Sequence, residues 1–129
     1  MIIYHITRQV DWDQALEAGS YRADTLETQG FIHCSKEEQV IQTANSFYRG
    51  LSGLVLLCIN SNLVIPEIRY ENLEGGEKLF PHIYGPLNLD AVLATYHFEP
   101  EHDGSFILPG DIINRLVSGH NRSLLIERI

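Results

Sequence analysis

The sequence predicts an α+β domain built on bent, mostly antiparallel sheets, with two main helices in the N-terminal half. Strand-like and helix-like patterns alternate only as far as residue 50, and strand patterns dominate after it. A doubly wound parallel sheet would alternate regularly along the chain. The chain has 129 residues, enough for one domain with its own core. No repeat, low-complexity tract or linker divides it, so we expect a single domain over residues 1–129.

The first strand and helix are predicted from residues 2–7 and the segment that follows. In a strand, alternate residues share a face, so His5 and Thr7 are expected to point the same way. Asp11 is the expected N-cap of the helix, because its carboxylate can accept from the free amides of the first turn. Gly19 is expected to end this helix.

The second strand leads directly into the second helix. Within the strand His33 and Ser35 share one face, while Cys34 points to the other face and into the core. Ser35 and Glu38 fit a capping box, so the helix is expected to begin at Ser35 and to end at Gly50. Capping is the preferred role for Ser35, and direct contact with a ligand is the alternative.

The remaining elements are mostly strands. The continuously apolar segment 54–60 predicts a central strand buried on both faces. Pro66 makes the extended segment 63–71 an edge or interrupted strand, because proline cannot donate to a neighbouring strand. A polar loop is expected at 72–78, and an alternating strand at 91–98.

Beyond residue 98 the pattern is less regular. Residues 99–104 predict a polar connection, and Asp111 is expected to cap a short helix. The apolar end of the chain, residues 123–129, predicts a further edge strand.

Charge and composition exclude several classes of function. The formal net charge is −8, and the few Lys and Arg residues form no cluster, so general nucleic-acid binding is not expected. No apolar run approaches the roughly 20 residues that span a bilayer, and the N-terminus does not resemble a secretory signal. We therefore expect a cytoplasmic protein without membrane partners.

Cys34 and Cys58 form no Cys-x-x-Cys pair and are expected to be reduced, buried and structural.

Candidate chemistry rests on three histidines, His5, His33 and His82, each of which lies in an apolar segment. An isolated imidazole there needs polar partners, so we expect the three to border one cleft. A metal site formed with Glu71 is not predicted, because separations of 28 and 49 residues are no local ligand spacing. Glycine-rich nucleotide motifs and the G-x-S-x-G nucleophile elbow are also absent.

Three segments carry a family resemblance: Tyr4-His5-Ile6-Thr7, Gly30-Phe31-Ile32-His33-Cys34-Ser35 and Phe80-Pro81-His82-Ile83-Tyr84-Gly85-Pro86-Leu87. With Trp12, Gly19-Ser20-Tyr21 and Glu71 in support, they resemble the bacterial family catalogued as domain of unknown function 952. The resemblance covers about residues 1–98. Residues 99–129 would then form a C-terminal extension outside the family pattern.

That family is similar in fold to the ADP-ribosyltransferases, which hold NAD between two bent sheets without a Rossmann motif. The resemblance implies that His5 holds the ribose, that His33 lies near the nicotinamide and that Glu71 is the catalytic acid. These three are the expected catalytic residues. The expected ligand-binding residues are Thr7, Ser35, His82 and Tyr84.

The resulting expectation is a histidine-lined cleft that binds NAD or a related ribonucleotide, in an enzyme similar to ADP-ribosyltransferases. No bound cofactor is predicted, and NAD is the candidate substrate. A non-catalytic small-molecule binding module is the alternative, and a histidine-based metal-dependent hydrolase is a weaker one. A Glu71 carboxylate turned into the cleft would favour the enzyme, whereas one turned to solvent would favour the binding module.

Overall fold

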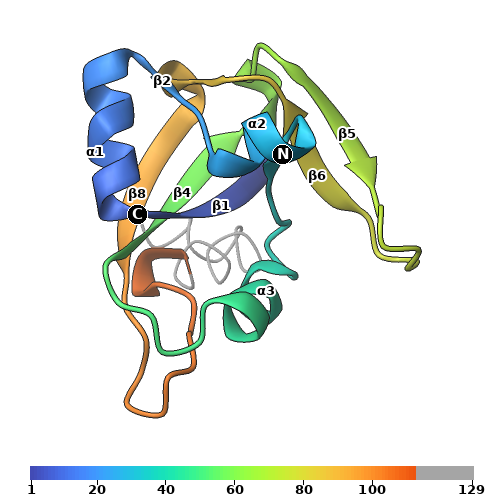
Figure 1. Cartoon of the computed structure of the whole chain (residues 1–129). Coiled ribbons are helices and arrows are strands. Elements are labelled where there is room, and N and C mark those ends of the chain that lie inside the picture. The colour runs from blue at the N-terminus through green and yellow to red at the C-terminus, as the bar shows by residue number, and fades with distance from the viewer. Residues whose placement is uncertain (113–129) are drawn as a thin grey trace, which may run out of the picture.

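A computed structural model describes residues 1–112, which form an α+β arrangement with antiparallel sheets (Figure 1). No helix in this part of the chain is long and apolar enough to cross a membrane. The helices and strands are β1 (Ile2–Arg8), α1 (Gln9–Ala18), β2 (Ser20–Tyr21), α2 (Asp24–Gln29), β3 (Ile32–His33), α3 (Val40–Phe47), β4 (Leu54–Asn60), β5 (Glu67–Glu71), β6 (Phe80–Tyr84), β7 (Leu87–Asn88) and β8 (Val92–Phe98).

The first sheet has the strand order β1-β4-β8, and both strand pairs are antiparallel. Its central strand is β4, in which every residue except Asn60 is buried, as its continuous apolar run predicts. Core side chains pack on both faces of this sheet. Alternation along β1 sends Ile3 to one core cluster, and Tyr4 and Ile6 to the other.

The second sheet has the order β3-β6-β5 and is also antiparallel. Strand β5 lies at its edge, as predicted from Pro66, which immediately precedes it. The two sheets are joined beyond β3, where Tyr4 and Ser35 exchange two backbone hydrogen bonds of 2.8 Å. Figure 1 shows β5 and β6 splayed away from the first sheet.

Cross-strand rows of the second sheet alternate between an apolar and a polar face. One row packs into the core and consists of Ile32, Ile83 and Ile68. The next row points to the opposite face and consists of His33, His82 and Arg69. The period of two along each strand therefore brings polar side chains from three strands onto one face.

The first predicted helix is confirmed as α1, and Gly19 ends it with a left-handed φ of +87°. Its start differs from the prediction, because the helix begins at Gln9 and Arg8 is the N-cap. Asp11 lies inside the first turn instead, where its carboxylate pairs with the Arg8 guanidinium at 3.0 Å. A carboxylate in this turn still favours the helix through the helix dipole.

The predicted capping box at Ser35 is wrong. Helix α3 begins at Val40, five residues later, and ends at Phe47, short of Gly50. The backbone of Ser35 is already used in pairing with β1, and its hydroxyl bonds that of Thr43 at 3.3 Å. A residue held in strand pairing on both its N–H and C=O cannot open a helix at the same time.

A further helix, α2, was not predicted. It is short, has no buried residue and ends at Gly30, whose φ of +87° turns the chain back into β3. The Thr25 hydroxyl then bonds the backbone oxygen of Phe31 at 2.8 Å, which ties the helix to the strand. Without an apolar stripe this helix has no periodic signal in the sequence.

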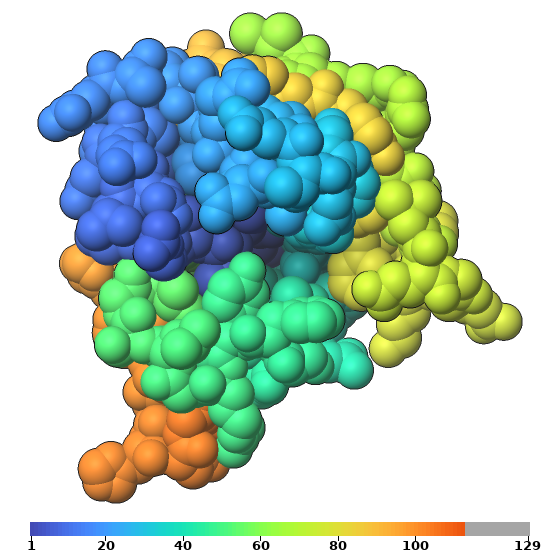
Figure 2. All heavy atoms as spheres, in the orientation of Figure 1, coloured from blue at the N-terminus to red at the C-terminus, as the bar shows by residue number. Residues whose placement is uncertain are grey.

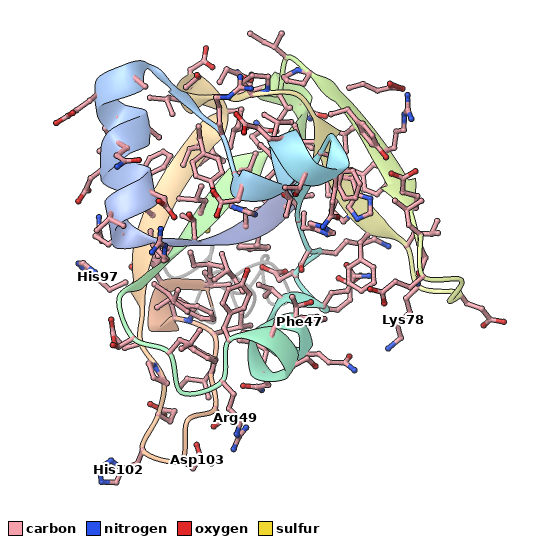
Figure 3. The ribbon with its side chains drawn as sticks, in the orientation of Figure 1. Phe47, Arg49, Lys78, His97, His102 and Asp103 are labelled. Carbon is pink, nitrogen blue, oxygen red and sulfur yellow. The ribbon has the colours of Figure 1, made fainter. Side chains whose placement is uncertain are left out.

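The described part of the extension joins the core. Phe106 and Ile112 are buried in the second core cluster, and Phe106 stacks on Phe98 at 4.7 Å. The preceding connection projects outward, with His102 and Asp103 at its tip (Figure 3). Residues 110–112 are helical, so Asp111 lies inside the first turn and not at the N-cap position expected for it. Residues 113–129, which contain the rest of the expected helix and the expected edge strand, lie outside the described residues.

Both cysteines are buried, as predicted: Cys34 is 4% exposed and Cys58 is 0% exposed. Cys34, which directly follows β3, packs in the first core cluster with Ile32, on the side opposite to His33. Burial raises the pKa of the Cys34 thiol, so the thiol form is retained at neutral pH.

Candidate functional site

One group of polar side chains lies inside the molecule, where His5 of β1 contacts Tyr21 of β2. His5 Nδ1 lies 2.5 Å from the backbone oxygen of His33, and His5 Nε2 lies 2.7 Å from the Tyr21 hydroxyl. The Tyr21 hydroxyl is also hydrogen-bonded to that of Thr7 at 2.9 Å. We call these three side chains, His5, Tyr21 and Thr7, the His5 chain.

The partners of His5 determine where its proton lies. A carbonyl oxygen only accepts, so Nδ1 carries the hydrogen and Nε2 accepts from Tyr21. His5 is 7% exposed, and burial lowers its pKa to about 4. At neutral pH the ring is therefore uncharged, with both nitrogens engaged inside the protein.

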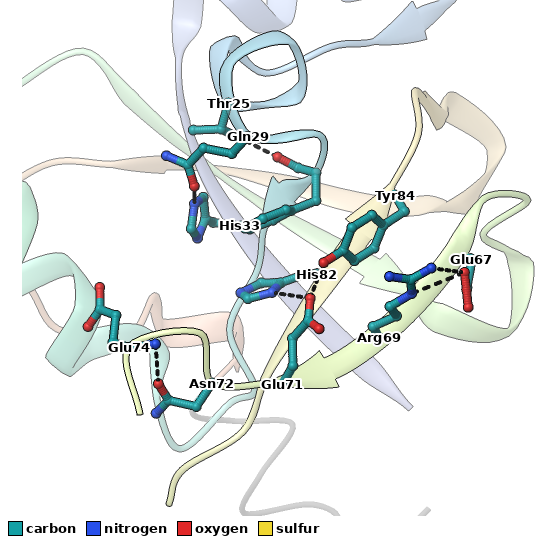
Figure 4. A network of polar contacts seen from close by, with 11 residues as sticks. Thr25, Gln29, His33, Glu67, Arg69, Glu71, Asn72, Glu74, His82 and Tyr84 are labelled. Carbon is teal, nitrogen blue, oxygen red and sulfur yellow. Dashed lines mark hydrogen bonds and ion pairs between the residues drawn. The ribbon is translucent and has the colours of Figure 1, made fainter. Parts of the chain in front are cut away.

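A second group lies on the polar face of the β3–β6–β5 sheet (Figure 4). We call it the open cluster: the rings of Phe31, His33, His82 and Tyr84 around the carboxylate of Glu71. The Phe31 ring stacks on His82 with centroids 4.2 Å apart and planes at 25°. It also contacts His33 at 4.7 Å and Tyr84 at 5.2 Å, and His33 meets His82 edge-on at 5.2 Å.

The carboxylate of Glu71 is held at one oxygen. Its Oε1 accepts from His82 Nδ1 at 3.0 Å and from the Tyr84 hydroxyl. No described residue hydrogen-bonds the second oxygen, Oε2, and the Glu71 side chain is 23% exposed. The bond from Tyr84, then that from His82, lowers the pKa of Glu71, so it is ionised at neutral pH.

The rim of the open cluster comes from α2, β5 and the loop after β5. His33 Nε2 lies 2.8 Å from Gln29 Oε1 at the end of α2. Burial, followed by the neighbouring His82, lowers the pKa of His33, while Glu74 acts in the opposite direction. The Arg69 guanidinium lies 4.3 Å above the Tyr84 ring.

The surface above this region is hollowed. Figure 2 shows a recess where α2, the segment after β3 and the β5–β6 hairpin come together. Exposure differs within the open cluster, since His82 and Phe31 are buried at 5% and 4% exposed, whereas Arg69 beside them is largely open to solvent. The open cluster therefore has a buried aromatic interior and a charged rim.

The structure brings together four of the seven sequence-predicted residues: His33, Glu71, His82 and Tyr84. His5 lies behind them and bonds the backbone oxygen of His33, and Thr7 is linked to His5 through the Tyr21 hydroxyl. Ser35 lies at the junction of the sheets, bonded to Tyr4 and Thr43.

Sequence reasoning missed Phe31, Tyr21, Gln29 and Arg69 as members of these groups. Two of them had a usable signal, because alternation places Phe31 on the face of His33 and Arg69 on the face of Glu71. Tyr21 and Gln29 come from short elements whose positions depend on tertiary packing.

The geometry gives no support to a three-histidine metal site. Both nitrogens of His5 are engaged, so it has no free lone pair to share with His33 and His82. Within residues 1–112, no three His, Cys, Asp or Glu side chains are grouped closely enough to hold an ion.

Comparison with known families identifies the chain. Residues 6–95 match the family model described as "Protein of unknown function (DUF952)". The chain belongs to this family. The matched region contains the whole open cluster. It also contains Thr7 and Tyr21 of the His5 chain, and His5 directly precedes it.

A solved structure is also similar to this member of the family. The crystal structure of protein CC0527 from Caulobacter crescentus is 32% identical, with a TM-score of 0.78 over 88% of this chain and 99% of that chain. The solution NMR structure of CC0527 gives a TM-score of 0.71 over 81% and 90% of the two chains. No curated protein matches this chain.

Proposed function

We propose that the open cluster binds NAD or a related ribonucleotide and that the protein cleaves or transfers at its glycosidic carbon. The observation that carries this proposal is the Glu71 carboxylate. One of its oxygens is anchored by His82 and Tyr84, and the other has no partner among the described residues. An ionised, oriented carboxylate beside aromatic rings suits a ligand that has hydroxyl groups and develops positive charge.

The rings suit a planar heterocycle. The exposed His33 ring and the half-buried Tyr84 ring, both backed by the buried Phe31 ring, form an aromatic surface against which a base or pyridinium ring can lie. A pyridinium such as nicotinamide is cationic, so aromatic faces and a carboxylate attract it. Arg69 at the rim, which is paired with Glu67 at 3.1 Å, offers its guanidinium to the phosphate groups of the same ligand.

The Glu71 side chain supports an enzyme more than a passive binding module. Breaking the nicotinamide–ribose bond builds positive charge on the ribose, and a nearby carboxylate stabilises that charge or the adjacent hydroxyl. One oxygen of Glu71 is held by His82 and Tyr84, while the side chain stays 23% exposed. A binding module without catalytic activity would gain little from a carboxylate held in this orientation.

An ADP-ribosyltransferase-like fold is part of the same proposal. Two antiparallel sheets meet at Tyr4 and Ser35, and the chain has no glycine-rich dinucleotide motif. A ligand held by side chains on a sheet face needs no such motif. Fold analogy alone is a weak argument for function, so the proposal depends on the open cluster.

The test combines binding and turnover. NAD, ADP-ribose and nicotinamide are titrated by calorimetry into the wild type, Glu71→Gln and Glu101→Gln, and nicotinamide release is followed by chromatography. Glu101→Gln removes the same charge from the exposed connection, so it controls for net charge. A ligand at 100 times its Kd would also raise the unfolding free energy by about 2.7 kcal/mol.

We expect the wild type and Glu101→Gln to bind NAD and release nicotinamide. We expect Glu71→Gln to bind NAD but to release nicotinamide at a reduced rate. Binding without release by the wild type would favour the non-catalytic module. If the wild type neither binds NAD nor releases nicotinamide, the proposal is wrong.

A further inference from the structure

We infer that His82 is the general base of this reaction and that Glu71 orients it, so that an oxygen nucleophile is activated at His82 Nε2. The inference rests on the proposed function and deepens it, because it names the group that takes the proton and the kind of acceptor. The argument comes from the hydrogen bonds of the His82 ring and from the ring that covers it.

The first step is the tautomer. His82 Nδ1 lies 3.0 Å from Glu71 Oε1, and an ionised carboxylate only accepts hydrogen bonds. Nδ1 therefore carries the hydrogen, and in the neutral ring Nε2 has the lone pair. No described residue hydrogen-bonds Nε2, which is the opposite of His5, whose two nitrogens are both engaged.

The second step is orientation. The Phe31 ring lies against one face of the His82 imidazole at 4.2 Å, and Glu71 holds the Nδ1 edge. The Tyr84 hydroxyl donates to the same Glu71 oxygen and so fixes the carboxylate in turn. A base that is held in one orientation by a carboxylate, which is held by a third group, has the arrangement needed to activate a nucleophile.

The third step is the chemistry. Water or an acceptor hydroxyl gives its proton to His82 Nε2 as its oxygen bonds to C1′ of the ribose. The C1′–N bond breaks, and its electron pair returns to the nicotinamide ring, which leaves uncharged. The imidazolium then releases the proton to solvent. Glu71 Oε2 remains available for the ribose, so the two oxygens of one carboxylate have separate tasks.

The decisive variant is His82→Asn. The asparagine amide nitrogen takes the place of Nδ1 and can still donate to Glu71, whereas Nε2 is lost. We expect kcat for nicotinamide release to fall by about 10²–10⁴-fold with little change in NAD affinity, the usual size of a general-base contribution. His102→Asn, at the exposed tip of the 99–105 loop, is the matched control and should keep the wild-type rate.

Products distinguish the acceptors. Mass spectrometry of the reaction should find free ADP-ribose if water is the nucleophile, and an ADP-ribosylated compound if an added alcohol or hydroxyl-bearing peptide is. Either product supports the inference, provided that its formation depends on His82. Full activity in His82→Asn would overturn the inference while leaving the proposed function intact.

A second measurement does not depend on substrate or on the folding of a variant. The ¹⁵N spectrum of the wild-type histidine rings should give His82 as the Nδ1–H form, whereas exposed His102 should favour Nε2–H. An Nε2–H form of His82 would overturn the inference. If the tautomer is as expected but the wild type releases no nicotinamide, there is no reaction in which His82 acts as a base. The inference then fails together with the proposed function.

Discussion

The His5 chain and the open cluster each contain a histidine beside a tyrosine, yet they differ in what their polar atoms contact. In the His5 chain both nitrogens of His5 bond atoms of the protein. In the open cluster His82 Nε2 has no partner among residues 1–112. The comparison teaches that an imidazole in an apolar segment holds the fold together when its lone pair is used internally, and is available for chemistry when it is not.

The two regions also differ in their electrostatics, although His5 and His82 are similarly buried, at 7% and 5% exposed. Desolvation lowers the pKa of His5 to about 4, so His5 stays neutral as a link between β1 and β3. In the open cluster, hydrogen bonds lower the pKa of Glu71 and keep a charge at the surface of the recess. One region is therefore expected to govern stability, and the other turnover.

The largest effect on stability is expected from His5→Ala. The change removes a buried ring and leaves the His33 carbonyl and the Tyr21 hydroxyl without their partner. Lost packing and unsatisfied polar groups together should lower the free energy of unfolding by about 4 kcal/mol. Urea unfolding measures this, and a loss below about 1 kcal/mol would show that the His5 chain is not a structural link.

The pH dependence of stability follows from the same histidine. Its pKa is about 4 in the folded state, against the ordinary histidine value of 6.5 in an unfolded chain, so between these values the unfolded state binds more protons. Stability should therefore be full above pH 6.5 and fall as the pH drops toward 4, by on the order of 3 kcal/mol. Glu71 titrates in a different window, because its contribution is lost only below its ordinary pKa of 4.5.

His5→Gln isolates that contribution, since the amide does not titrate. Urea unfolding at pH 7, 5.5 and 4.5 should give a clearly flatter profile for this variant than for the wild type. Identical profiles would place the pH dependence elsewhere in the molecule.

A smaller loss is expected from Tyr21→Phe. The ring keeps its packing against Trp12 and His5, and only the hydroxyl that links His5 Nε2 to Thr7 is removed. Leaving buried groups without a partner should cost about 1–3 kcal/mol. The measurement is urea unfolding at pH 7, and a variant as stable as the wild type would contradict the closed hydrogen-bond chain.

The smallest change in stability is expected from Glu71→Gln, even though this variant should release nicotinamide more slowly. The side chain is partly exposed and solvent can replace much of what its carboxylate provides. Thermal unfolding should place it closer to the wild type than Tyr21→Phe. A larger loss of stability than in Tyr21→Phe would mean that the open cluster is primarily structural.

Alternation along single strands could be predicted from the sequence. It assigned His5 and Thr7 to one face of β1 and Cys34, directly after β3, to the core, and the structure confirms both. These assignments succeed because side-chain direction in a strand depends only on the backbone period.

Contacts between distant elements could not be predicted in the same way. The bond from His82 to Glu71 depends on the antiparallel register of β5 and β6, and the contact between His33 and His82 depends on that of β3 and β6. The failed capping box has a similar cause, because strand pairing of Ser35 with Tyr4 outweighed a local preference. The site therefore follows from tertiary pairing, which no local pattern in the sequence encodes.

The most direct test of the central claim, that the open cluster receives the ligand while the His5 chain does not, is a titration of the wild type with NAD followed by histidine NMR. The six histidines report from different parts of the chain. The account predicts large, saturable shifts of the His33 and His82 ring signals, smaller shifts for His5, and none for exposed His97 and His102. Saturable shifts at His97 or His102 with His33 and His82 unmoved would contradict it.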